Sequence, residues 1–176
     1  MPGVNEPAPP WSSAGQAGQA GQAGQAGRAG QAGRTGRAGQ AALRQRRPFV
    51  DTNVLLYLIS ADAAKAERAE QVLAGRIVIS VQVLNEFANV ARRKHSLDWA
   101  ELQQVLAGIS SFCEVLDLTL ATHQRGLALA RRYPLSIYDA MIAAAALDAG
   151  CDSLLSEDFQ TGQRIDGQLL VVNPFL

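Results

Sequence analysis

The sequence predicts an α/β protein, a three-layer sandwich with a mostly parallel central sheet and helices on both faces. Short apolar segments that are typical of buried strands alternate with longer segments that have helical spacing. Gly, Pro and polar residues separate these segments and mark the turns between them. Alternating strands and helices favour a parallel sheet, because each helix returns the chain to the edge of the sheet where the previous strand began.

The elements can be assigned in order along the chain. We expect strands at residues 47–50, 76–80, 115–118, 153–155 and 169–172. We expect helices at residues 52–60, 63–74, 81–94, 98–110, 120–132 and 136–149. Asp98 and Glu101 have the spacing of a capping box, and Ser136 and Gly150 are typical of a helix start and a helix end.

The composition divides the chain at residue 47. Residues 1–47 have no apolar periodicity and consist mainly of Gly, Ala, Gln and Arg, whereas residues 48–176 have the composition of one compact domain. The first segment holds six of the 16 Lys and Arg residues but one of the 16 Asp and Glu residues. A basic, low-complexity tail, which we expect to be disordered, therefore precedes an acidic domain.

The tail has one regular feature, a glycine at every third position from Gly15 to Gly39. That period is the collagen signature, and it raises the hypothesis of a structural protein organised by a triple helix. Collagen also needs abundant proline, which this repeat lacks. Disorder is therefore the favoured interpretation of the tail.

The remaining composition bears on location. Cys113 and Cys151 show no disulfide or metal-binding spacing and follow no secretory segment, so we expect reduced thiols in a cytoplasmic protein. No apolar run approaches the roughly 20 residues that span a bilayer. We therefore expect a soluble protein with no membrane partner.

Four acids stand at the ends of elements or on helix faces that border the expected sheet edge. They are Asp51, Glu86, Asp139 and Asp158. Each has an ordinary explanation: a helix cap for Asp51, a solvated helix flank for Glu86, half of a capping box with Ser136 for Asp139, and a turn for Asp158. Glu157 beside Asp158 is an equal candidate by spacing alone.

Asp139 is the hardest of these to explain by capping alone. It lies in the first turn of a helix that continues as Met141, Ile142, four alanines and Leu147, with almost no polar face. We expect this helix start to be buried, where a carboxylate is costly unless a cation shares the site. Carboxylates gathered without His or Cys suit Mg²⁺ or Mn²⁺, and such a site performs metal-assisted phosphoryl chemistry.

Four motifs and a closing strand resemble the PIN domain, and more closely a VapC-type toxin ribonuclease. They are Phe49–Asn53, Ser80–Phe87, Ser136–Ala145 and Leu154–Phe159, followed by Val171–Phe175. The resemblance implies an endoribonuclease whose Mg²⁺ or Mn²⁺ is held by Asp51 and Asp139. It also implies that Glu86 and Asp158 complete the acidic cluster, with Thr52, Asn53 and Ser156 as polar neighbours.

The resemblance further implies partners: an RNA substrate, a cognate antitoxin protein and a second copy of the chain in a homodimer. Arg92, Arg93 and Lys94 form a basic cluster at a helix end, which either complements the helix dipole or contacts RNA phosphates. Two functional hypotheses follow. The chain is a metal-dependent endoribonuclease, or it is a catalytically silent PIN-like module that binds RNA or serves as a scaffold.

Overall fold

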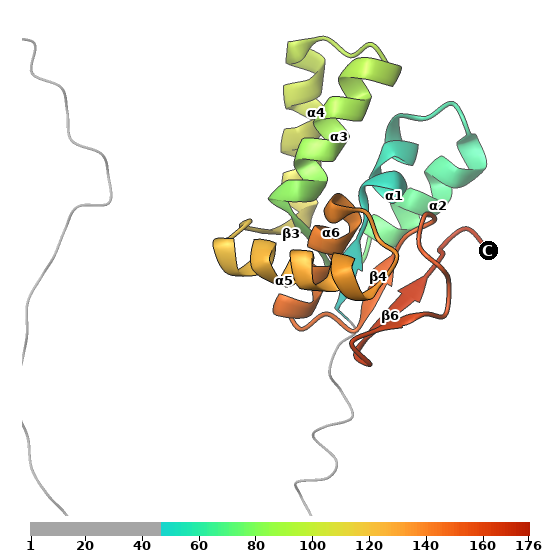
Figure 1. Cartoon of the computed structure of the whole chain (residues 1–176). Helices are drawn as coiled ribbons and strands as arrows, with labels where there is room; N and C mark the ends of the chain where they lie inside the picture. The colour runs from blue at the N-terminus through green and yellow to red at the C-terminus, as the bar shows by residue number, and fades with distance from the viewer. Residues whose placement is uncertain (1–46) are drawn as a thin grey trace, which may run out of the picture. The chain divides into compact units, whose positions relative to one another are not determined.

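The computed structural model describes residues 47–176, which form one six-stranded sheet with helices packed around it (Figure 1). The helices are α1 (Thr52–Leu56), the 3₁₀ helix η2 (Tyr57–Ile59), α2 (Ala63–Leu73), α3 (Val81–Lys94), α4 (Trp99–Phe112), α5 (Leu120–Arg132) and α6 (Ile137–Asp148). The strands are β1 (Pro48–Val50), β2 (Ile77–Ser80), β3 (Cys113–Leu116), β4 (Ser153–Leu155), β5 (Arg164–Ile165) and β6 (Leu169–Val172). The expectations for the tail, disorder or a collagen-like repeat, fall on residues 1–46 and so lie outside the described part.

The strand order is β3-β2-β1-β4-β6-β5. Every neighbouring pair is parallel except β5 with β6. From β1 the chain moves outward through β2 to β3, and it then crosses back to β4 on the other side of β1. The order therefore reverses between β1 and β4, which makes this the switch point of the sheet.

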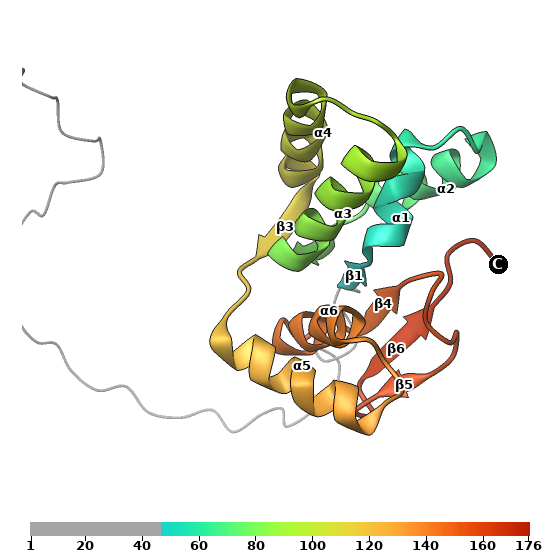
Figure 2. The same ribbon diagram turned by 45° about the horizontal axis from the view of Figure 1, so that its top comes forward.

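The helices form two groups. Because crossovers between parallel strands are right-handed, the outward crossovers place α1 to α4 on one face, and the return crossover places α5 and α6 on the other. In Figures 1 and 2, α5 and α6 lie side by side. The predicted α/β class with a mostly parallel sheet is confirmed.

Every predicted element is present, but two differ clearly from the form expected. The expected helix at residues 52–60 is split into α1 and η2. β3 begins at Cys113, two residues before the expected strand, because it pairs with β2 from Ile77↔Cys113 to Ser80↔Leu116. All four β3 residues are only partly buried, so their sequence carries a weak strand signal. At β3, tertiary pairing therefore overrides the local pattern.

The sequence interpretation missed β5. This two-residue strand pairs antiparallel with β6 after a turn through Asp166 and Gly167. Both turn residues have positive φ, 49° and 72°, as the hairpin-forming turns require. The Asp-Gly dipeptide before β6 was the available signal, since Asp-Gly is a preferred sequence for such turns.

Helix α6 lies between the sheet and α5, and it is buried without interruption from Ala140 to Leu147. It can approach α5 closely because Gly126 of α5 faces Met141 of α6. A β-carbon built on Gly126 would lie 3.1 Å from Met141 Cγ and 3.2 Å from Met141 Cα. The absence of a side chain at Gly126 therefore sets the spacing of the two helices.

Two further features of residues 47–176 bear on the earlier expectations. None of the helices in this range is long and apolar enough to cross a membrane. Cys113 and Cys151 are free thiols, and burial raises the pKa of each to about 11.

We predict that Gly126→Ala destabilises the protein. The new methyl group would force α5 away from the backbone of Met141, and such overpacking costs about 1–3 kcal/mol. This exceeds the roughly 1 kcal/mol that alanine gains over glycine in a helix. Gly108→Ala in α4 is the matched control, because no atom lies within 4 Å of its added β-carbon. Denaturant unfolding should show opposite signs for the two variants, and equal stabilisation of both would contradict the packing argument.

Candidate active site

The candidate site lies at the switch point, where β1 and β4 end side by side. The register Val50↔Leu155 sets the two strand ends level. Asp51 follows β1 and Ser156 follows β4, and the Asp51 amide donates to the Leu155 carbonyl at 3.0 Å. Ligand sites of open parallel sheets lie at this kind of crevice, outside the carboxyl ends of the strands.

Asp51 is the buried acid of the site, with 3 % of its surface exposed. Its carboxylate accepts three hydrogen bonds: from the Thr52 amide at 2.6 Å, from Ser156 Oγ at 2.6 Å and from Asn53 Nδ2 at 2.9 Å. All three donors are neutral. The bonds orient the carboxylate, but among residues 47–176 no Lys or Arg side chain forms an ion pair with it.

This environment changes the acidity of Asp51. The pKa of Asp51 is raised to about 7, mainly by burial and also by the negative charges of Asp139 and Glu86, against the lowering effect of the Ser156 and Thr52 bonds. A cation at the site would reverse this shift, since an opposite charge favours the ionised carboxylate. Asp51 is thus the position where a bound cation would relieve the largest electrostatic cost.

Glu86 approaches from α3. Its Oε1 accepts from Gln82 Nε2 at 2.7 Å, and its Oε2 accepts from Thr52 Oγ1 at 3.3 Å. Gln82 is one helical turn earlier on the same face and is buried. Thr52 stands next to Asp51, so its hydroxyl connects the wall formed by α3 to the end of β1.

The expectation that the start of Asp139's helix is buried is wrong. Ile137 and Tyr138 are 51 % and 63 % exposed, Asp139 is half-buried, and full burial begins at Ala140. Water therefore reaches the first turn of α6. Ser136 Oγ accepts from the Asp139 amide at 3.1 Å and donates to Asp139 Oδ2 at 2.8 Å. The buried carboxylate that the argument required is Asp51.

Asp158 and Glu157 are distinguished by their partners. Asn53 Nδ2 lies 3.0 Å from Asp158 Oδ2 and 3.0 Å from Ser156 Oγ, so Asp158 joins the network around Asp51. Glu157 instead accepts from Lys65 Nζ at 2.6 Å and from the Tyr57 hydroxyl at 2.5 Å. Lys65 lowers the pKa of Glu157. Glu157 is therefore occupied by an ion pair, and Asp158 is the acid that remains at the site.

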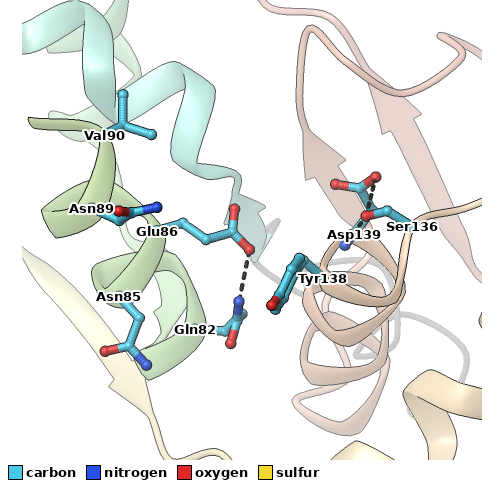
Figure 3. A pocket seen from close by; sticks show the side chains of 8 residues that line it. All are labelled: Gln82, Asn85, Glu86, Asn89, Val90, Ser136, Tyr138 and Asp139. Carbon is cyan, nitrogen blue, oxygen red and sulfur yellow. Dashed lines mark hydrogen bonds between the residues drawn. The ribbon is translucent and has the colours of Figure 1, made fainter. Parts of the chain in front are cut away.

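A groove of about 510 Å³ opens beside these acids, between α3 and α6. Figure 3 shows Glu86 on the α3 wall and Asp139 on the α6 wall, with Tyr138 projecting between them. Gln82, Asn85, Asn89, Val90 and Ser136 complete the lining. Gln82 and Tyr138 were not among the predicted site residues. The i−4 spacing of Gln82 from Glu86 and the position of Tyr138 beside Asp139 were the available signals.

The acids do not form a tight cage. Within residues 47–176, no three His, Cys, Asp or Glu side chains lie close enough together to hold a metal ion. Asp51 is coupled electrostatically to Asp139 and Glu86, while Asp158 is joined to it through Asn53. The arrangement is an open set of carboxylates around one buried member.

The basic cluster lies at the far end of α3. Arg92 is partly engaged there: its Nη1 donates to the Leu97 carbonyl at 2.5 Å, and its guanidinium stacks over the Trp99 ring at 4.5 Å. Arg93 and Lys94 are exposed in the same last turn. Their expected contact with RNA stays a prediction.

The fold and site define an α/β protein with carboxylates at the switch point of a parallel sheet. The PIN domain family model matches residues 49–164, and the chain belongs to this family. No curated protein sequence matches the chain.

Solved structures give a consistent result. A toxin–antitoxin complex from Klebsiella pneumoniae is 25 % identical with a TM-score of 0.56, and the match covers 72 % of this chain and 97 % of that one. DNA-bound VapBC from Salmonella typhimurium is 26 % identical with a TM-score of 0.53, over 72 % and 98 % of the chains. VapC20 from Mycobacterium tuberculosis, a sarcin–ricin loop cleaving toxin, is 18 % identical with a TM-score of 0.51, over 63 % and 91 %, and shows the fold alone. The resemblance to PIN domains of toxin–antitoxin systems is confirmed.

We predict that Asp51→Asn changes the pH dependence of stability. The folded state holds the Asp51 proton up to about pH 7, whereas the unfolded chain releases it near pH 4. In the metal-free protein the free energy of unfolding should therefore fall as pH rises from about 4 to 7, by roughly 4 kcal/mol if the whole shift is realised. Asparagine carries no charge and removes this contribution.

The measurement is urea unfolding of both proteins in EDTA across this pH range. As the pH rises, the free energy of unfolding of the Asn variant should increase relative to that of the wild type. Asp117→Asn, at an exposed position after β3, is the control and should retain the wild-type slope. Parallel curves for wild type and Asp51→Asn would contradict the assignment of a buried, costly carboxylate to Asp51.

Proposed function

We propose that the chain is a metal-dependent endoribonuclease that hydrolyses RNA phosphodiesters and acts as the toxin of a toxin–antitoxin pair. The observation that carries the proposal is the Asp51 carboxylate. It is buried at the switch point, held by three neutral donors and raised in pKa by burial and by two further acids. An uncompensated carboxylate in this position suits a bound cation.

The donor set fits Mg²⁺, with Mn²⁺ as an alternative. All the candidate ligand atoms are carboxylate oxygens, which hard divalent cations prefer. Mg²⁺ is commonly held by one or two carboxylates together with water and substrate oxygens, which agrees with an open set of acids rather than a cage. In this proposal Asp51 and Asp139 hold the ion. Such an ion supplies a Lewis acid that activates water and offsets charge on the phosphate.

The chain's own residues provide the orientation. Ser156 and Asn53 hold Asp51 in place, and Asn53 holds Asp158 by the same amide nitrogen. Gln82 and Thr52 fix Glu86 on the opposite wall. In this proposal Glu86 and Asp158 orient the attacking water or bind a second ion. Preorganisation of this kind lowers the activation free energy, because the reacting groups need not be ordered during the reaction.

The comparisons support the choice of substrate and partner. VapC20 is described as a toxin that cleaves the sarcin–ricin loop. The Klebsiella structure is a toxin–antitoxin complex, and the Salmonella structure is VapBC bound to DNA. We extend RNA cleavage and an antitoxin partner to this chain, in the cytoplasm, with Arg93 and Lys94 as candidate phosphate contacts. We also propose a homodimer, for which the exposed Leu118 and Leu120 offer apolar area.

One observation favours the catalytically silent alternative. The absence of a three-acid cluster within residues 47–176 would suit a PIN module that binds RNA but holds metal too weakly for turnover. The two functions differ in one outcome, which is metal-dependent cleavage.

We predict that the full chain cleaves RNA with Mg²⁺ and loses this activity in EDTA. Asp51→Asn and Asp139→Asn should each reduce cleavage by at least about 100-fold, because each removes part of the metal's stabilisation of the transition state. The measurement is the rate of fragment formation from total RNA, followed by mapping of the fragment ends.

Asp117→Asn is the matched control and should cleave at the wild-type rate. Full activity of Asp139→Asn would refute the proposed ligand pair. RNA binding without cleavage by the wild-type protein in Mg²⁺ or Mn²⁺ would support the silent module instead.

A further inference from the structure

The groove between α3 and α6 is lined by polar side chains other than the acids. Asn85 and Asn89 lie on one side of α3, three and seven residues after Gln82, and both are exposed to the groove. Asparagine is a poor residue for a helix interior. In the described part of the chain, neither amide forms a hydrogen bond, whereas the buried Gln82 amide is occupied by Glu86. Two side chains that can each donate and accept are therefore free to meet a ligand.

The opposite wall presents an aromatic ring. Tyr138 is 63 % exposed although it belongs to the helix with the most continuous burial in the protein. Figure 3 shows its ring projecting from α6 toward α3, with Gln82 nearby and Asp139 next to it on α6. A large exposed ring at the edge of a groove provides a flat apolar surface that a planar ligand can cover.

The charge of the groove limits what can bind. Glu86 and Asp139 contribute two carboxylates, and none of the lining residues is Lys or Arg. An anionic group is therefore disfavoured in the groove itself, while a neutral planar group with donors and acceptors at its edge matches both walls. The volume of about 510 Å³ is within the usual range for small-molecule sites.

We propose that this groove binds an unpaired nucleobase of the RNA substrate. The base stacks on Tyr138, and its edge forms hydrogen bonds with the amides of Asn85 and Asn89. Single-stranded RNA is recognised in this way, by aromatic stacking and by hydrogen bonds to exposed base edges. This inference rests on the proposed ribonuclease function and assigns three residues of the groove to recognition of a base.

The position of the groove defines which base is bound. Glu86 and Asp139 line the groove together with Asn85, Asn89 and Tyr138. The groove is therefore continuous with the acidic site. The bound base therefore belongs to a nucleotide next to the scissile phosphate. Tyr138, Asn85 and Asn89 are specificity-determining residues in this assignment, while the four acids perform the chemistry.

The test is a binding experiment that needs no cleavage. The full chain with Asp51→Asn, in Mg²⁺, is titrated with labelled hexamers of A, C and U and with an abasic hexamer of the same backbone. Adding Tyr138→Ala should weaken binding of the base-containing hexamers roughly 5- to 100-fold, the usual loss for one base–aromatic contact. The abasic hexamer should be unaffected. Tyr138→Phe should retain the affinity, because the ring is kept.

Further variants separate stacking from edge recognition. Asn85→Ala and Asn89→Ala should change the ranking of the A, C and U hexamers more than they change binding of the abasic one. Phe112→Ala, which removes a ring that is 70 % exposed on α4, is the control and should bind as the parent does. Because Tyr138 is exposed, the melting temperature of Tyr138→Ala should remain close to that of the parent.

Two results would overturn the inference: equal affinities of the Tyr138→Ala and Tyr138 proteins for the base-containing hexamers, or an equal loss for the abasic hexamer. Neither result would affect the ribonuclease proposal, which depends on cleavage by the wild-type chain. Conversely, base-dependent binding in a protein that never cleaves RNA would support the groove and reject the nuclease.

Discussion

The parallel pairing of β1 with β4 is the contact on which the rest of the site depends. It brings Ser156 within 2.6 Å of the Asp51 carboxylate, although 105 positions separate the two residues. Side chains alternate along a strand, so a shift of one residue in this pairing would turn Ser156 away from Asp51. The carboxylate would then stay buried with one donor fewer. The register of β1 with β4 thus determines how well the Asp51 carboxylate is hydrogen-bonded.

The site has one buried carboxylate, and the other acids around it are accessible to solvent. Asp51 is enclosed and oriented by neutral donors, while Glu86 and Asp139 face the groove and Asp158 is exposed. Charge is therefore costly at one point only, because water screens the other acids. A cation that entered from the groove would meet Glu86 and Asp139 first and would reach the buried Asp51 carboxylate, where its charge is most favourable, last. The same gradient explains how four acids can share one end of a sheet in a folded protein.

The sequence predicted much of the fold because its strands and helices carry clear local signals. Helices 81–94 and 120–132 and strands 153–155 and 169–172 have the predicted bounds. The bounds of the half-buried β3 were predicted wrongly and the two-residue β5 was missed, because the limits of both strands depend on pairing with other strands. Three of the four acids were proposed from their positions at element ends and Glu86 from its place on a helix face, but the sequence did not predict how deeply each is buried. The sequence shows that α6 is apolar, yet only the three-dimensional packing shows that its first turn is exposed and that Asp51, not Asp139, is enclosed.

The run of alanines in α6 has a consequence for how this protein can evolve. From Ala143 to Ala146 every side chain is a single methyl group, and all four are buried. A larger residue there would move the helix rather than fill a void, because the interior is already closely packed. Since Asp139 is attached to the same rigid helix, that movement would displace it relative to Asp51. Among homologous sequences, we therefore expect the buried positions of this helix to change slowly, although their side chains take no part in the chemistry. The size of these residues would be conserved because it fixes the distance between the Asp51 and Asp139 carboxylates.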